Sequence, residues 1–343
     1  MIEQITSLSP LLIVVVTTAL LFDFVNGWND SANAIATVVG TRVLGPIKAV
    51  TVAAITNLVG ALAGTAVAKT IYKGLLYTGP GFIEGDVVVL VVLAAMLGAI
   101  VWAAWMTLIG LPISGSHSLV GGLVGAAVAA GGVRVLQGGG IGKVLIAMLI
   151  SPLAGAIIAF LMLLAIYWIV KSYYPVPINR SFSVLQVISC CLMGFNHGLN
   201  DAQKVMGVIT MALIAGGIQD PLTHPAPFLW VKIACAVMIS LGTAIGGWKV
   251  IKTLGHHLSK LTPVDGFAAE TAASIVLSLA ARWGVPVSTT HTITGCIMGV
   301  GSRRGLGAVK WAVGQKIILA WVFTLPTTAA LAGGIYWILS EWM

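Results

Sequence analysis

The chain has 343 residues, of which 58% are hydrophobic and 8% are charged, and its mean hydropathy is +1.03. This composition excludes a soluble globular protein, because too few polar side chains are present to cover a surface of that size. The formal net charge of +8 comes from basic residues in short breaks between apolar runs, a pattern typical of anchoring at lipid headgroups rather than of nucleic-acid binding.

Long apolar runs without a period of two predict membrane-spanning helices rather than a β-barrel. We therefore expect a multi-pass protein of the cell membrane, surrounded by the lipid bilayer and without a nucleic-acid partner. In chain order, the runs predict helices over residues 8–27, 31–40, 46–68, 87–110, 143–170, 184–198, 202–216, 228–251, 267–282 and 310–340. Two further segments, 117–131 and 291–301, are shorter than the ~20 residues that a helix needs to cross a bilayer.

Two of these runs end just before an Asn-Asp pair, Asn29-Asp30 and Asn200-Asp201, and each pair has a glycine two positions earlier. A carboxylate in the middle of a bilayer costs about 2.5–3.5 kcal/mol to insert, so it persists only where it is bound or hydrated. We expect the helix to break at each pair. The carboxylate and amide oxygens suit a small hard cation.

Pro112 and Pro286 each stop or kink the helix that arrives there. Each is followed by hydroxyl side chains that suit an N-cap, and then by a short apolar run. We expect a broken or re-entrant helix pair at each proline, whose new N-terminus presents free N–H groups and attracts an anion. The hydroxyls at these N-termini, which suit an oxyanion, are Ser114, Ser116, Ser118, Ser288, Thr289, Thr290 and Thr292.

Both motifs recur at nearly the same offset, which predicts an internal duplication. Asn200 follows Asn29 by 171 positions, and His291 follows His117 by 174 positions. Repeats of this kind are typical of transporters whose site lies between the two halves, near the bilayer midplane. We expect a first transmembrane repeat over 1–171, a short linker over 172–183 and a second repeat over 184–343, forming one membrane domain.

These motifs resemble the inorganic phosphate transporters of the Pit type, a family of cation-coupled phosphate symporters. The family signature is similar to Gly27-Trp28-Asn29-Asp30-Ser31-Ala32-Asn33-Ala34, and a related motif is present at Gly198-Leu199-Asn200-Asp201. The family's Pro-Val-Ser-Thr-Thr-His segment is present at 286–291, with a degenerate copy at 112–117. The resemblance covers nearly the whole chain. It implies an all-α phosphate permease with two inverted-topology repeats, re-entrant helical hairpins, a homodimeric assembly and no cofactor other than the coupling ions.

The resemblance also implies roles for individual residues. Those expected to bind sodium are Asp30, Asp201, Asn29, Asn200, Ser114 and Ser288. Those expected to bind phosphate are Ser114, Ser116, Ser118, Asn29, Asn200, Gln203, Ser288, Thr289 and Thr290. A proton-transfer or gating role is open for Glu270, His117, His291 and Lys204. For the two histidines structural hydrogen bonding is the alternative. Lys204 could neutralise phosphate charge, or it could equally snorkel or pair with a neighbouring carboxylate.

Two alternatives to sodium-coupled transport remain at the level of the sequence. Coupling to protons, or transport of a metal-phosphate complex, would use the same buried carboxylates. An intramembrane hydrolase would use Ser116 with His117, or Thr290 with His291. The duplication argues against an enzyme, because catalysis needs one nucleophile and one base rather than two equivalent sets. We favour sodium, since each aspartate stands beside an asparagine and faces hydroxyl oxygens.

Overall fold

The structure, a computed structural model, describes residue 4 and residues 6–342. Within that part of the chain the regular structure is helical, apart from three isolated β-bridges. The long helices are α2 (Pro10–Gly40), α3 (Pro46–Leu62), α5 (Asp86–Ile109), α6 (Gly115–Gly131), α7 (Gly138–Val170), α8 (Pro175–Ala215), α9 (Leu229–Ile245), α11 (Pro263–Arg282), α12 (Thr289–Ser302) and α13 (Trp311–Ser340). The shorter pieces are α4 (Ala66–Gly74), η1 (Val133–Val135), α10 (Trp248–Lys252), η2 (Thr253–His257) and η3 (Leu306–Ala308).

The helices confirm the prediction of an all-α membrane protein. Among the described residues, 6 helices are long and apolar enough to cross a bilayer, and the number rises to 8 if two bent helix pairs each count as a span. The first bent pair joins α3 to α4 at 65°, and the second joins α9 to α10 and η2 at 63°. The predicted single helices over 46–68 and 228–251 are therefore each broken.

The predicted breaks at the Asn-Asp pairs are wrong. α2 and α8 run through Asn29-Asp30 and Asn200-Asp201 without interruption. The preceding glycines serve helix packing instead: a Cβ on Gly27 would lie 2.1 Å from the Ile239 carbonyl oxygen of α9. A Cβ on Gly198 would lie 2.0 Å from a backbone oxygen of α3. Each glycine therefore lets a neighbouring helix approach without breaking its own.

The two prolyl hairpins are confirmed. α5 ends at Gly110, whose φ is +82°, and the chain passes Pro112 before α6 begins at Gly115. The corresponding turn after α11 has Gly284 at φ +65° and leads past Pro286 into α12. With 17 and 14 residues, α6 and α12 are too short to cross a bilayer.

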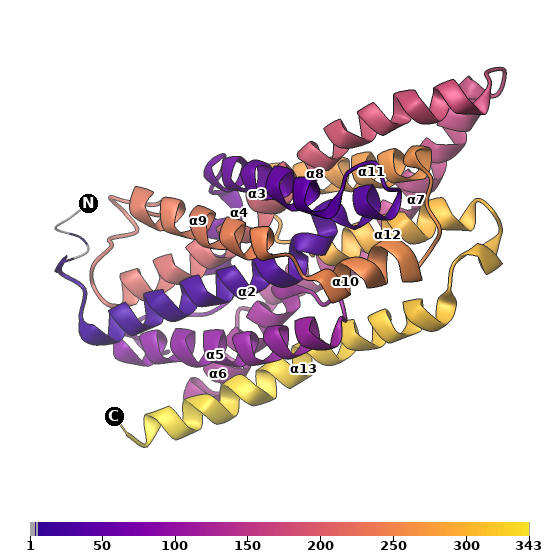
Figure 1. The fold of residues 1–343 in the computed structure, drawn as a ribbon. Helices are drawn as coiled ribbons and strands as arrows, with labels where there is room; N and C mark the ends of the chain where they lie inside the picture. The colour runs from indigo at the N-terminus through magenta and orange to yellow at the C-terminus, as the bar shows by residue number, and fades with distance from the viewer. Residues whose placement is uncertain (1–3, 5, 343) are drawn as a thin grey trace.

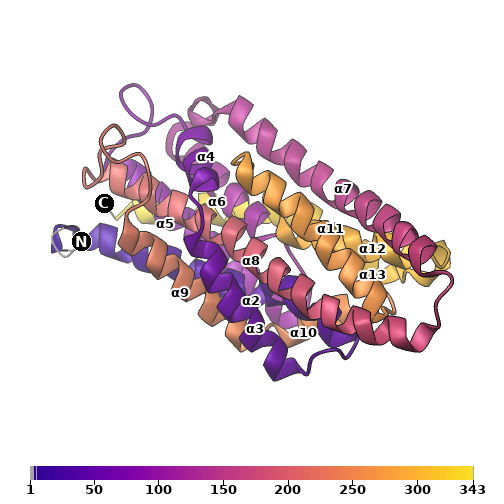
Figure 2. The ribbon, with the colours of Figure 1, turned by 90° about the horizontal axis from the view of Figure 1, so that it is seen from above.

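Helices from the two halves of the chain interleave. α3 and α4 pack on α8, whereas α9 packs on α2, α13 on α6 and α7 on α12 (Figure 2). α2 starts at the end of the molecule where both termini lie, and α8 starts at the opposite end (Figure 1). The chain leaves α7 at Val170 and enters α8 at Pro175, so most of the expected linker is helical. The division into two repeats stays a prediction.

A polar layer separates two hydrophobic clusters. On α2, Leu12 to Phe22 contribute to one cluster and Ala32 to Val38 to the other. On α8 the order is reversed, because Cys190 and Met193 belong to the second cluster and the segment from Ala202 to Leu213 contributes to the first. The two helices therefore pass through the same clusters in opposite directions, and both Asn-Asp pairs lie in the layer between.

Candidate functional site

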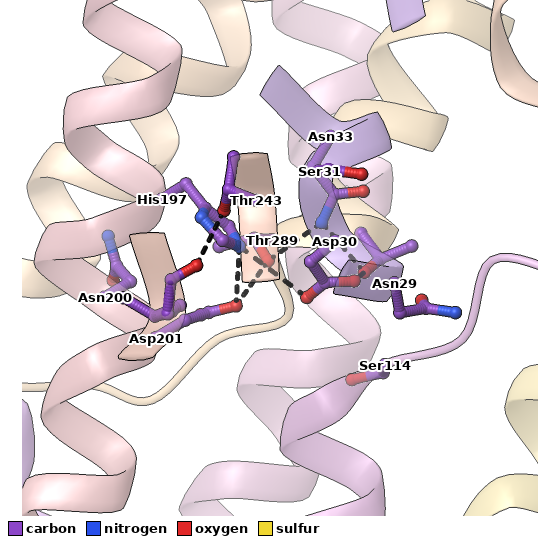
Figure 3. A network of polar contacts seen from close by, with 12 residues as sticks. Asn29, Asp30, Ser31, Asn33, Ser114, His197, Asn200, Asp201, Thr243 and Thr289 are labelled. Carbon is purple, nitrogen blue, oxygen red and sulfur yellow. Dashed lines mark hydrogen bonds and ion pairs between the residues drawn. The ribbon is translucent and has the colours of Figure 1, made fainter. Parts of the chain in front are cut away.

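The two aspartates meet at one imidazole. The Nε2 atom of His197 lies 3.8 Å from Oδ2 of Asp30 and 3.4 Å from Oδ2 of Asp201 (Figure 3). All three side chains are buried, and one ligand atom from each lies within 4.8 Å of the others. The expected convergence of the two Asn-Asp motifs is therefore present in the structure.

The N-terminus of α12 supplies hydroxyls to both carboxylates. Thr289 Oγ1 donates to Asp201 Oδ2 at 2.9 Å, and Thr290 Oγ1 donates to Asp30 Oδ1 at 2.9 Å. The amide nitrogen of Asn33 donates to both threonine hydroxyls, at 3.2 and 3.1 Å. Two carboxylates that would repel one another across a dry gap are thus each held by a hydroxyl donor.

Ser288 and Ser114 act as N-caps. Ser288 Oγ accepts from the backbone N–H of His291 at 3.2 Å, and Ser114 Oγ accepts from that of His117 at 3.1 Å. The hydroxyls of Ser118 and Thr292 donate to backbone carbonyls of their own helices. Each serine therefore satisfies an otherwise free N–H group at the start of a half-helix.

Lys204 connects the N-terminus of α6 to the carboxylates. Its Nζ pairs with Asp201 Oδ1, donates to Ser116 Oγ and donates to the Val287 carbonyl at 2.8 Å. Ser116 Oγ in turn donates to the same carbonyl at 3.0 Å. Of the two roles left open for Lys204, the structure shows pairing with a carboxylate, and it places the ammonium between Asp201 and α6.

The two motif asparagines lie on opposite sides of the carboxylate pair (Figure 3). The amide nitrogen of Asn29 donates to Thr107 Oγ1 at 2.8 Å, and that of Asn200 donates to the carbonyls of Asn196 and Leu277 at 2.8 and 3.2 Å. Their side-chain oxygens have no hydrogen-bond partner among the described residues. The same holds for Asp30 Oδ2 and Asn33 Oδ1. Four buried acceptor oxygens around the carboxylate pair are thus left without a donor, and oxygens are the ligands that a hard cation prefers.

Gln203 lies outside this cluster. Its Oε1 accepts from the backbone N–H of Val67 at 2.8 Å, at the start of α4, and its Nε2 donates to the Leu199 carbonyl at 2.6 Å. It therefore holds the bend between α3 and α4 against α8.

His117 and His291 are also away from the carboxylates. Their rings are 4.5 Å apart, and the ring of His291 stacks at 3.8 Å on Trp321. Nδ1 of His291 lies 3.4 Å from the Met148 carbonyl. Both rings line an apolar cavity of about 660 Å³ between α7 and α13.

Glu270, on α11, lies in a separate polar site that contacts α2 at Thr37. Its carboxylate accepts from the hydroxyls of Thr37 and Ser189, and from Gln186 Nε2 at 3.4 Å. Thr37 follows Asp30 by seven residues on α2. Glu270 therefore contacts α2 two helical turns beyond Asp30 and does not belong to the aspartate cluster.

Besides Asn33, which stands in the signature motif, four residues at the site were not assigned roles from the sequence. His197 lies between the aspartates, and its Nδ1 is 3.3 Å from Oδ1 of Asn57, whose amide nitrogen donates to Thr243 at 2.8 Å. Thr107 binds Asn29 from α5. His197 could have been found from its position four residues before Asp201, which places both on one helix face. Asn57, Thr243 and Thr107 have no local signal, since each is brought in by another helix.

Comparisons with known proteins agree with this geometry. A family model described as "Phosphate transporter family" matches residues 26–332. A protein of Rhizobium meliloti named "Probable low-affinity inorganic phosphate transporter" is 42% identical over 95% of this chain and 96% of its own length. A protein of Bacillus subtilis with the same name is 40% identical over 96% of this chain and 97% of its own length.

A solved structure shares the fold. The protein described as "The sodium-dependent phosphate transporter" superposes with a TM-score of 0.89 at 24% identity, over 98% of this chain and 100% of that one. At that identity the likeness concerns the fold alone. The sequence relatives cover nearly all of both chains, and on that basis the chain belongs to the phosphate transporter family.

Proposed function

We propose that this chain imports inorganic phosphate together with sodium ions by alternating access, at a site near the bilayer midplane between two inverted repeats. The observation that carries the proposal is the meeting of Asp30 and Asp201 with the hydroxyl-bearing N-terminus of α12. Relatives named as phosphate transporters and a sodium-dependent structural neighbour support it. Membership of a transporter family argues against the hydrolase considered above.

The sodium ions would bind to the carboxylates and to the free amide oxygens. Asp30 Oδ2 and the Oδ1 atoms of Asn29 and Asn200 are buried and have no donor among the described residues. Oxygen donors of this kind are what hard cations prefer. The hydroxyl oxygens of Ser114 and Ser288 each keep a lone pair after accepting from the backbone, and they complete the proposed sodium ligands.

The phosphate would bind at the N-termini of α6 and α12. These ends carry the hydroxyls of Ser116, Thr289 and Thr290 and the positive ends of two helix dipoles. The Lys204 ammonium stands beside them. Binding phosphate requires these hydroxyls and the ammonium to turn from the carboxylates to the phosphate oxygens. Sodium would then take their place on the carboxylates.

Charge explains why the two substrates need each other. When Asp30, Asp201 and Lys204 are ionised and His197 is neutral, these four side chains leave one negative charge in the buried layer, and phosphate adds one or two more. Each uncompensated charge at that depth costs at least about 2.5–3.5 kcal/mol. Sodium ions bound beside the phosphate neutralise this charge, so the loaded site can close while the phosphate-only site cannot.

The arrangement of the helices supports alternating access. α2 and α8 start at opposite ends of the molecule, and the same sequence of a long helix, a bent pair and a prolyl hairpin follows each (Figure 1). Inverted repeats, which are related by a pseudo-two-fold rotation axis in the membrane plane, can exchange their conformations, and this exchange opens the site to the other side. A homodimer in the cell membrane, as the family resemblance implies, remains part of this proposal.

One observation favours a second candidate, the transport of a divalent metal-phosphate complex. His197 Nε2, Asp30 and Asp201 offer three ligand atoms within 4.8 Å of one another. Imidazole with two carboxylates suits a transition metal better than sodium. In this reading the metal would enter with the phosphate, as substrate.

Uptake of labelled phosphate by proteoliposomes containing the purified chain tests both candidates. A sodium gradient should drive accumulation of unaltered phosphate, whereas a potassium gradient of equal size should not. Accumulation that requires an added divalent cation and ignores sodium would favour the second candidate. No phosphate accumulation under any gradient would contradict the proposed function.

A further inference from the structure

α2 carries a second buried aspartate. Asp23 precedes Asp30 by seven residues, which places both on one face of the helix, about 10 Å apart along its axis. Its side chain is fully buried, and neither carboxylate oxygen has a hydrogen-bond partner among the described residues. Thr37, the contact of Glu270, follows Asp30 by the same interval. Asp23, Asp30 and the contact with Glu270 thus lie along one face of α2. Asp23 is the one nearest the end of the molecule where the termini lie.

The neighbours of Asp23 offer almost no polarity. From α9 the Cys235 thiol faces it, and a thiol is a weak hydrogen-bond donor. From α8 the ionisable groups that act on it across the layer are Asp201, His197 and Lys204. α5 has no ionisable side chain beyond Asp86. On α2 itself, Ala19 and Phe22 belong to a hydrophobic cluster, and the buried Asn26, one turn on, makes no hydrogen bond to Asp23.

These surroundings distinguish Asp23 from the other buried acids. Glu270 receives three donors, and Asp30 and Asp201 each receive a threonine hydroxyl. The side chain that faces Asp23, the Cys235 thiol, offers sulfur rather than the oxygen ligands that sodium prefers. A charged carboxylate without donors is costly to bury, and a bound proton removes that charge.

We propose that Asp23 binds and releases a proton in each transport cycle, as a coupling site separate from the sodium and phosphate site. This inference rests on the proposed function. A proton from the solution on one side converts the carboxylate to the neutral acid and leaves on the other side after the helices have exchanged their packing. Gly27, one turn from Asp23, holds α2 against α9, so a movement between these helices would uncover Asp23.

The test compares wild type with Asp23→Asn in proteoliposomes that have equal sodium on both sides and a pH gradient of one unit, acidic outside. A proton moving down that gradient contributes about 1.4 kcal/mol, so wild-type accumulation should exceed that of Asp23→Asn by up to about tenfold. Phosphate ionisation changes equally for both proteins and cancels in the comparison. With a sodium gradient alone, Asp23→Asn should still accumulate phosphate. Asp23→Glu should keep the response to pH, and Cys235→Ala serves as the neighbouring control.

An Asp23→Asn protein that responds to the pH gradient as wild type does would overturn the inference. So would a wild type that is driven by sodium but not by pH, a result that leaves the proposed function intact. If Asp23→Asn fails to fold, infrared spectra of wild type and Asp23→Glu replace it. A shifted band of a protonated carboxyl group is expected, and no difference in that band contradicts a proton on Asp23.

Discussion

Asp30 and Asp201, which are 171 positions apart in the chain, lie 3.8 and 3.4 Å from the same nitrogen of His197. They come from antiparallel helices that cross in the polar layer between two hydrophobic clusters. The relationship brings two acidic groups to one point at membrane depth, where their charges must be compensated. In the proposed mechanism, bound cations supply part of that compensation and let phosphate approach.

Removing either carboxylate should abolish sodium-driven uptake. Asp30→Asn and Asp201→Asn keep the size of the side chain but remove the charge that holds the cation. Initial rates of labelled phosphate uptake under a sodium gradient are the measurement, with Asp220→Asn, in an exposed loop, as the matched control. Sodium dependence retained in both variants would show that the coupling ion binds elsewhere.

The hydroxyls of Thr289 and Thr290 at the start of α12 should determine the apparent affinity for phosphate and sodium. Thr289→Val and Thr290→Val keep the shape of the side chains and remove the hydroxyls that would turn from Asp201 and Asp30 to the phosphate. A hydrogen bond to a charged group is worth about 1.5–3 kcal/mol, so apparent affinity for sodium or phosphate should fall about 10- to 150-fold. Thr289→Ser and Thr290→Ser should restore it.

The control for these variants is Thr51→Val. Thr51 is exposed, and its hydroxyl donates to the Ile47 carbonyl of its own helix. Unchanged half-saturation constants for sodium and phosphate in both valine variants would mean that these hydroxyls do not take part in binding.

Chelation separates the two candidate functions. If the imidazole of His197 positions the carboxylates for sodium, EDTA should leave sodium-driven uptake unchanged, because sodium is not bound by the chelator. His197→Gln keeps a hydrogen-bonding group near Asn57 and should weaken uptake without making it depend on divalent cations. Uptake that stops with EDTA and returns with Mn²⁺ or Mg²⁺ would instead support the metal-phosphate complex.

Much of the site follows from local sequence. The hairpins are predicted by Pro112, Pro286 and the hydroxyl residues that follow each proline. A proline ends the helix that arrives at it, and a hydroxyl side chain caps the helix that starts directly after it, so both effects depend only on nearby residues. The aspartates stand out because a charge is costly in an apolar helix. These are effects that neighbouring residues alone decide.

The errors come from contacts between distant helices. Gly27 and Gly198 looked like helix breaks, but each faces the backbone of a helix from the other half of the chain. The bend between α3 and α4 is held by Gln203, more than 130 positions later. Asp23 was passed over because it lacks the adjacent asparagine, and its isolation becomes visible only when its neighbours are known.

Close packing at Gly27 should make it a stability determinant. A methyl group there would lie 2.1 Å from the Ile239 carbonyl oxygen, and neither backbone can retreat without moving α2 or α9. Gly27→Ala should therefore lower the thermal stability of the purified protein in detergent and reduce its yield, as overpacked sites do.

Gly334→Ala, in α13, is the matched control, because a Cβ there meets no atom within 4 Å. Its melting temperature should equal or exceed that of wild type, since alanine favours a helix by about 1 kcal/mol over glycine. Equal melting temperatures for Gly27→Ala and wild type would show that the contact between α2 and α9 is looser than the structure places it, and the packing role of the signature glycine would have to be abandoned.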